Sequence, residues 1–140
     1  MAMATMVQPA LDPEHLSVSV EAVKARHGGP PWTERLVSND RYVVTAICQA
    51  PGHQNDWHYH IVDECWFIYE GELSWTMEGY EEPVRVKAGD WVLAPANTCH
   101  FIQVHGDRPS IRIAIAYTGE PHRHEREGGM PPAPPGVRLP

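Results

Sequence analysis

The sequence predicts an all-β domain, a small barrel or sandwich built from short antiparallel strands. Apolar runs rich in β-branched and aromatic residues recur along the chain, and glycine, proline, asparagine and aspartate separate them at close intervals. The chain has 140 residues, of which 42% are hydrophobic and 21% charged, which is typical of an ordinary globular protein. This length suffices for one domain with a single hydrophobic core.

The N-terminal segment, residues 1–30, is expected to be loosely ordered over residues 1–12. A short helix follows from Ser19 to His27, because Ser19 is a favourable start and the glycine pair 28–29 a favourable end. The barrel is expected over residues 31–118. Its predicted strands are 32–37, 42–48, 57–60, 64–69, 72–77, 83–87, 91–94, 99–104 and 110–117.

The last segment, residues 119–140, is rich in proline, glycine and charge and has almost no apolar periodicity. We expect an extended tail, draped over the domain or over a partner subunit. The tail contains the pair His122 and His124. A flexible, solvated segment is the favoured interpretation of this pair, with metal capture as the alternative.

Composition excludes several classes of partner. The formal net charge of −7 argues against binding to nucleic acid or to an anionic membrane, because both require a basic patch. Apolar runs are too short for a membrane span, and the first 15 residues lack the basic and apolar regions of a secretory signal. Three cysteines without tight spacing do not form a disulfide framework. We therefore expect a cytoplasmic protein.

A metal site is indicated by the pattern of histidine and glutamate. In a strand over residues 57–60, His58 and His60 lie on the same face. Residues 61–63 allow only a tight reversal, so we expect Glu64 to begin a second strand paired with the first, with its carboxylate turned toward the two imidazoles.

The fourth donor is His100, which begins a strand after a turn at Pro95 and Asn97. Three imidazoles and one carboxylate suit one divalent transition metal ion: Fe, Mn, Ni, Co, Cu or Zn. Four protein ligands in an octahedral ion leave two positions for water, substrate or dioxygen.

These two stretches resemble the two motifs of the cupin superfamily. The first matches G(X)5HXH(X)3E(X)6G at every fixed position, namely Gly52, His58, His60, Glu64 and Gly71. The second resembles G(X)5PXG(X)2H(X)3N through Gly89, Pro95 and His100, with Asn97 and Val104 in place of the motif's Gly and Asn. The resemblance covers roughly residues 35–117.

The resemblance implies an antiparallel double-stranded β-helix, or jelly roll, with His58, His60, Glu64 and His100 as metal ligands. Similar proteins include dioxygenases, decarboxylases, isomerases and lyases that act on small organic acids or diketones. The substrate-lining candidates are Trp66, Ile68, Ile102 and Val104. An apolar inner wall with few fixed charges, and with Arg112 in solvent, favours a small, moderately apolar or aromatic oxygenated substrate over a phosphorylated sugar.

Three functions remain open at this point. The first, which we favour, is an oxidoreductase, a dioxygenase that uses Fe(II) or Mn(II) and acts on a small oxygenated organic substrate inside the barrel. The second is a metal-assisted isomerase, lyase or decarboxylase, which needs a general base in addition to the metal; Glu70, His53 and Tyr117 are the candidates. The third is a binding protein for a small molecule, without turnover. We also expect a homodimer, because aromatic strands and the N-terminal segment offer surface to cover.

Overall fold

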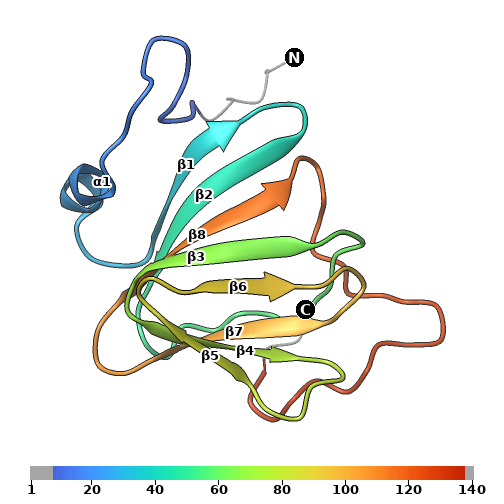
Figure 1. Ribbon diagram of the computed structural model, residues 1–140. Coiled ribbons are helices and arrows are strands. Elements are labelled where there is room, and N and C mark those ends of the chain that lie inside the picture. Colours follow the sequence, from blue (N-terminus) through green and yellow to red (C-terminus); the bar gives the residue numbers. More distant parts are fainter. Residues whose placement is uncertain (1–7, 138–140) are drawn as a thin grey trace, which may run out of the picture.

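Two antiparallel sheets and one short helix make up the computed structural model, which describes residues 8–137 (Figure 1). The elements are α1 (Val20–His27), β1 (Trp32–Ser38), β2 (Tyr42–Gln49), β3 (Glu64–Glu70), β4 (Glu72–Met77), β5 (Val84–Lys87), β6 (Trp91–Ala94), β7 (His100–His105) and β8 (Ser110–Tyr117). The all-β prediction is confirmed, and so is the short N-terminal helix.

The chain crosses repeatedly between the two sheets. One sheet has the strand order β1-β2-β8-β3-β6 and the other the order β5-β4-β7. Thus β3 and β6 lie in the larger sheet, whereas β4 and β7, which follow them, lie in the smaller one. This alternation between two facing antiparallel sheets is the jelly-roll arrangement.

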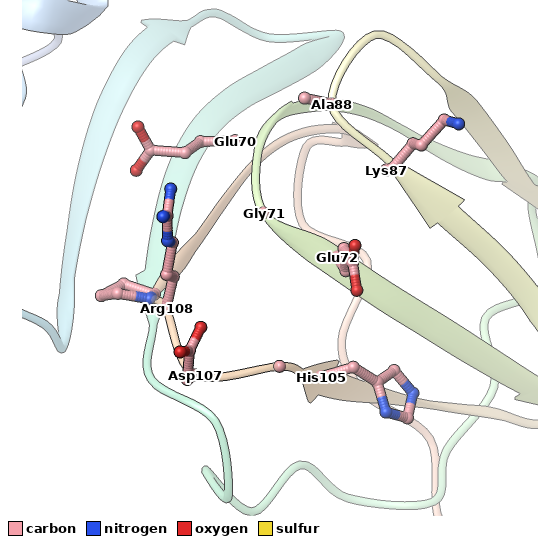
Figure 2. Close-up of a pocket in the computed structure, with 10 residues that line it drawn as sticks. Glu70, Gly71, Glu72, Lys87, Ala88, His105, Asp107 and Arg108 are labelled. Atoms are coloured by element: carbon pink, nitrogen blue, oxygen red, sulfur yellow. The ribbon is translucent and has the colours of Figure 1, made fainter.

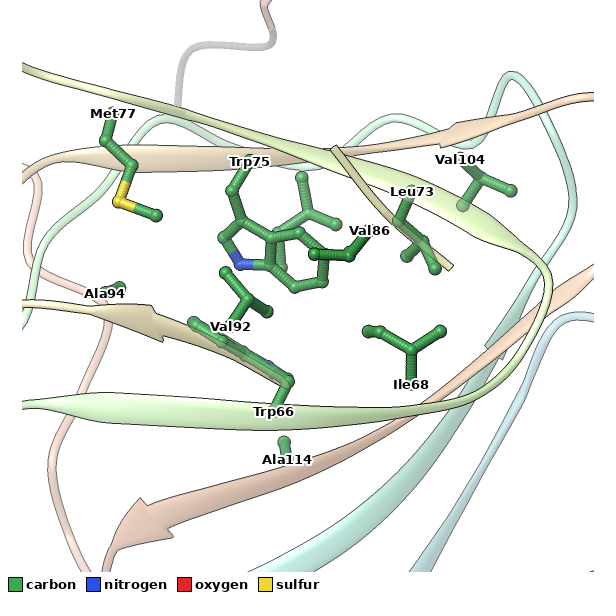
Figure 3. Packing of buried hydrophobic residues seen from close by; sticks show 11 residues of the cluster. Trp66, Ile68, Leu73, Trp75, Met77, Val86, Val92, Ala94, Val104 and Ala114 are labelled. Carbon is green, nitrogen blue, oxygen red and sulfur yellow. The ribbon is translucent and has the colours of Figure 1, made fainter. Parts of the chain in front are cut away.

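The main core fills the space between the sheets. Trp66 and Ile68 of β3 face Leu73 and Trp75 of β4, and the two indole rings lie 5.1 Å apart (Figure 3). All four side chains are at most 2% exposed. Burying such a side chain stabilises the fold by roughly 1.5–3 kcal/mol, so these inward positions hold the sheets together.

The N-terminal segment packs outside the barrel. Ser19 caps α1 by accepting a hydrogen bond from the backbone N–H of Ala22, and Val23 of the helix is buried against β1 and β2. Ala10 and Leu11 donate backbone hydrogen bonds to β1, each 2.9 Å long. Residues 8–12 therefore follow the sheet edge more closely than the sequence predicted; residues 1–7 lie outside the described part.

One predicted pairing is wrong. Residues 57–60 do not form a regular strand beside the strand of Glu64. They make isolated bridges instead, His58 with His100 and Tyr59 with Arg123. The reason is that β3 already pairs with β6 on one side and β8 on the other, which leaves β3 no free edge.

Within residues 8–137, no helix is long and apolar enough to cross a membrane. Several large apolar side chains, among them Trp91, Leu93 and Tyr117, are exposed on the outside of the larger sheet. The homodimer stays a prediction.

Candidate metal centre

Four side chains from three separate stretches converge at one end of the barrel. His58 and His60 come from the segment before β3, Glu64 is the first residue of β3, and His100 is the first residue of β7. Their ligand atoms all lie within 4.8 Å of one another. The backbone bridge between His58 and His100, with N···O distances of 3.3 and 2.8 Å, brings the two histidine stretches together.

The hydrogen bonds of the three imidazoles fix which ring nitrogen carries the proton. Nδ1 of His60 lies 2.9 Å from the carbonyl oxygen of Pro121, and Nδ1 of His100 lies 3.3 Å from that of Thr98. Nδ1 of His58 lies 3.2 Å from the carbonyl oxygen of Asp56. Since a carbonyl oxygen only accepts, each Nδ1 donates, and each Nε2 keeps a free lone pair.

The Nε2 atoms of His60 and His100 are buried and have no hydrogen-bond partner among residues 8–137. His60 Nε2 lies 3.2 Å and His100 Nε2 lies 3.8 Å from the same carboxylate oxygen of Glu64. Buried nitrogen lone pairs gathered around a carboxylate are costly unless something satisfies them. This donor set fits a divalent metal ion, which coordinates neutral imidazole and carboxylate together.

Burial and neighbouring charges act differently on the two buried rings. Burial lowers the pKa of His100 to about 3, and charge on the neighbouring His58 acts in the same direction. Burial also acts to lower the pKa of His60, but the Glu64 carboxylate and the Pro121 carbonyl outweigh it and raise that pKa. Bound metal would take the place of a proton on His60.

A cavity of about 360 Å³ opens beside two of these four residues. His60 and Glu64 form part of its wall, and His122 and Tyr117 lie on it as well. The remaining lining residues are Arg35, Ser38, Val43, Val62, Asp63, Ala116, Thr118, Gly119 and Glu120. A small molecule in this cavity would contact His60 and Glu64.

The tail histidines are part of this end of the molecule, contrary to the flexible segment that the sequence favoured. Arg123 pairs with Tyr59 in antiparallel fashion, which places His122 and His124 beside His60 and His58. The ring of His122 stacks on that of His58 with centroids 3.7 Å apart and planes 2° from parallel. The pair His122 and His124 was a sequence signal for this site, but the sequence did not show which segment lies beside the pair.

Asp56 connects these histidines. Its carboxylate lies 3.2 Å from Nδ1 of His58, 3.3 Å from Nδ1 of His122 and 2.5 Å from Nε2 of His124. Burial alone would raise the pKa of Asp56, but the hydrogen bonds from the three histidines outweigh it and hold this pKa far below its usual range. Asp56 is therefore ionised and accepts from each ring. No motif pointed to it.

The substrate-lining candidates Trp66, Ile68, Ile102 and Val104 lie in the main core, at 2%, 0%, 6% and 4% exposure. The cavity beside the metal ligands is lined by other residues. A substrate contact for these four stays a prediction, while their packing role is plain.

From the sequence, Arg112 is expected in solvent and the inner wall is expected to carry few fixed charges. The position of Arg112 shows that its placement in solvent was wrong and that the inner wall carries a charge. Arg112 stands beside Ile68 in the strand register and is 4% exposed, because its side of β8 faces the barrel interior next to small alanines. Its Nη1 donates to Oε1 of Gln49 at 2.7 Å, and burial lowers its pKa to about 10.

Of the three general-base candidates, only Tyr117 borders the cavity at the metal ligands. Glu70 lies at the opposite end of β3 and pairs with Lys24 at 2.6 Å. His53 is an exposed residue of the loop before the metal-ligand segment.

Comparison with known proteins agrees with this geometry. The chain matches the family described as Cupin domain over residues 46–117, about half of its length. It is 28% identical over 88 residues to dimethylsulfoniopropionate lyase DddQ of Ruegeria pomeroyi, a match that covers 63% of this chain but only 40% of the lyase. This chain thus corresponds to less than half of that curated relative.

Solved structures support the same fold. A double-stranded β-helix protein from Klebsiella pneumoniae superimposes with a TM-score of 0.60 at 23% identity, over 74% of this chain and 90% of its own. An RmlC-like cupin from Methanocaldococcus jannaschii gives 0.58 at 25% identity, over 66% and 84%. The polyketide cyclase RemF from Streptomyces resistomycificus gives 0.57 at 19% identity, over 64% and 66%.

Proposed function

Because the chain belongs to the cupin family, we propose that it is a metal-dependent enzyme that acts on a small oxygenated organic substrate. The reaction we infer is of the lyase or isomerase type and begins with removal of a proton from carbon. The observation that carries this proposal is His122, which borders the same cavity as His60 and Glu64 and has one ring nitrogen held by Asp56.

The metal would be held by Nε2 of His58, His60 and His100 and by the carboxylate of Glu64. When bound, it would act as a Lewis acid that polarises a carbonyl or carboxylate oxygen of the substrate. The same donor set accepts Fe, Mn, Ni, Co, Cu or Zn. Polarisation makes a neighbouring C–H more acidic, so a base nearby completes the chemistry.

His122 supplies such a base. The ionised carboxylate of Asp56 can only accept a hydrogen bond, so Nδ1 of His122 must donate to it. Nε2 of His122 then keeps a free lone pair, with which it takes a proton from substrate in the cavity. Asp56 orients the ring and stabilises the charge that the ring gains, as the carboxylate does in other Asp–His pairs.

A dioxygenase is the second candidate function. The set of three histidines and one glutamate is suited to Fe(II) or Mn(II), and the apolar ring of Trp66 packs edge-on against His100 with centroids 5.5 Å apart. The donor set permits the oxidoreductase that the sequence indicated. The two functions differ in one requirement, since only the dioxygenase consumes dioxygen.

The test is turnover of a panel of small organic acids and ketones by metal-loaded protein, with and without dioxygen. The panel includes dimethylsulfoniopropionate, because the relative DddQ is named as its lyase. We expect substrate loss to continue without dioxygen; turnover that stops without dioxygen would support the dioxygenase. Binding of panel members without turnover under either condition would reject both enzymes and leave a binding protein.

A matched variant tests the role of His122. In His122→Asn, the side-chain amide replaces Nδ1 as a donor to Asp56 but offers no counterpart to Nε2. We expect kcat to fall by about 100-fold or more while metal content is unchanged, since a general base contributes on the order of 100- to 10,000-fold. An unchanged kcat would exclude His122 as the base.

A further inference from the structure

The C-terminal segment does more at the metal centre than present His122 to the cavity. Two of the three imidazoles are oriented by contacts that depend on residues 119–131, which we call the strap. Nδ1 of His60 donates directly to the carbonyl oxygen of Pro121 at 2.9 Å. Nδ1 of His58 lies 3.2 Å from both the carbonyl oxygen and the carboxylate of Asp56, and His124 of the strap lies 2.5 Å from that carboxylate.

The metal-ligand segment has little other support. Residues 57–60 belong to neither sheet, and their backbone is held by the bridge between His58 and His100, by the bridge between Tyr59 and Arg123, and by a 2.7 Å hydrogen bond from Asn97 N–H to the carbonyl of His60. The bridge to Arg123 joins this segment to the strap. The orientation of His60 therefore depends on where the strap lies.

Anchors on the ligand segment itself hold the strap in place. The hydroxyl of Tyr59 donates to the carbonyl of Glu125 at 2.7 Å, and Nε1 of Trp57 donates to the carbonyl of Pro131 at 3.1 Å. Both rings are buried, at 8% and 4% exposure. Together with Cys99 they form a small apolar cluster, against which pack Phe101, Met130, Ala133 and Val137.

An arginine ties the strap to the barrel. The guanidinium of Arg126 donates to both carboxylate oxygens of Glu78, at 3.0 and 2.8 Å, and to the carbonyl of Asn97 at 2.7 Å. It also lies over the ring of Tyr59, 4.6 Å from the centroid. A bidentate, stacked arginine is a specific attachment.

We propose that the strap completes the metal centre: residues 119–131 orient His58 and His60 and thereby set how tightly the ion is held. This inference rests on the metal site of the proposed function, but not on the reaction. Outer hydrogen-bond partners of metal-bound histidines typically contribute 10–100-fold in metal affinity. The strap supplies these contacts from a part of the chain outside both cupin motifs.

The experiment loosens the strap without touching a ligand or its direct hydrogen-bond partner. The triple variant Trp57→Phe, Tyr59→Phe, Arg126→Ala removes two hydrogen-bond donors while keeping an aromatic ring at each position, and removes the guanidinium. A control with the same three changes at exposed positions, Trp91→Phe, Tyr80→Phe, Arg85→Ala, leaves the strap alone. Affinity for Zn²⁺ and Co²⁺ is measured by competition with a chromophoric chelator, after circular dichroism has shown that each protein is folded.

We expect the triple variant to bind one ion per chain about 10–100-fold more weakly than the wild type, with faster dissociation, and the control to match the wild type. Arg126→Ala alone should show a smaller loss in the same direction, and it serves as the second variant if the triple variant does not fold. Unchanged affinity in a folded strap variant would overturn the proposal. The proposal would also be overturned if the wild-type chain bound two ions and His122→Asn lost one of them, because His122 would then be a metal ligand itself.

The outcomes separate the strap from the reaction. If the strap variants bind metal more weakly and the wild-type protein turns over no substrate, the role of the strap in metal binding is supported and the proposed reaction is rejected. If those variants keep full metal affinity and the wild-type protein does turn over substrate, only the role of the strap in metal binding is rejected.

Discussion

The two ends of the barrel differ in whether their buried polar groups have hydrogen-bond partners. The end opposite the metal ligands, formed by the turns after β3, β5 and β7, has the larger cavity, about 580 Å³ against 360 Å³ (Figure 2). Charged side chains line it, and none of their nitrogen or oxygen atoms is among the buried unpartnered atoms of residues 8–137: Glu70 pairs with Lys24 at 2.6 Å, and Nε2 of His105 lies 2.7 Å from the hydroxyl of Ser74.

At the metal end the situation is reversed. Two buried ring nitrogens, on His60 and His100, have no partner among residues 8–137. Unsatisfied buried nitrogen is costly, whereas a partnered surface charge is not. The metal end is therefore marked by two unsatisfied ring nitrogens that converge on one carboxylate, and not by the volume of the cavity; the unpartnered nitrogens of Trp75 and Arg112 have no such convergence.

The motif residues divide between the two ends in the same way. The histidines and Glu64 serve the metal end, whereas Gly71 serves the turn between β3 and β4 at the other end. Its φ is +89°, and a Cβ there would stand 2.8 Å from the Cα of Ser110. Only glycine fits this position, for a reason of packing and not of chemistry.

The largest expected difference between the ends is in metal content. His58→Ala or Glu64→Ala should lower bound metal by an order of magnitude or more and leave the fold largely intact, because one of four ligands is lost. His105→Ala, the control at the other end, should leave metal content unchanged. Elemental analysis of untagged protein measures both; equal metal content in all these proteins would contradict the assignment of the ion to His58 and Glu64.

Metal addition should stabilise the fold through the metal end alone. An ion present at 100 times its Kd adds about 2.7 kcal/mol to the free energy of unfolding, and this should raise Tm by roughly 5–10 °C. Thermal melts followed by circular dichroism check the shift. The metal-induced shift in Tm should vanish in Glu64→Ala and persist in Lys87→Ala at the opposite end. A shift that persists in both variants would show that the ion binds at another site.

The smallest expected difference concerns ion pairs and pH. Hydrogen bonds from Arg126 lower the pKa of Glu78 against the opposing effect of burial. Because the pKa is lower in the folded state, the pair stabilises the protein above the ordinary glutamate pKa of about 4.5, and this stabilisation is lost as the pH falls through the lowered folded value.

Urea titrations at pH 7 and pH 3 should therefore show that Glu78→Gln costs about 1 kcal/mol at the higher pH and less at the lower. The matched change at the opposite end, Glu70→Gln, should cost less at pH 7, since the Glu70 side chain is 41% exposed against 27% for Glu78. A cost of Glu78→Gln that grows toward acid pH would contradict the assigned pairing.

Much of the architecture followed from local pattern. Apart from residues 57–60, strand and helix ranges agreed closely, because alternation of apolar residues and the placement of glycine, proline and asparagine act over a few neighbours. The same holds for Ser19 as helix cap and for Asn97, which adopts a φ of +63° in the predicted turn. The convergence of His58, His60, Glu64 and His100 followed from the spacing of donor residues within two motifs.

Residue type and short spacing were thus enough to predict most of the elements and the four candidate ligands. Contacts between distant segments place Arg112 inside the barrel, pair residues 57–60 with β7 and the C-terminal segment, and bring Asp56 and His122 beside the candidate ligands. These facts depend on which distant segments meet. The physical reason is that hydrogen bonds and burial across the fold join residues as far apart as Asp56 and His124, and no short-range pattern records such a pairing.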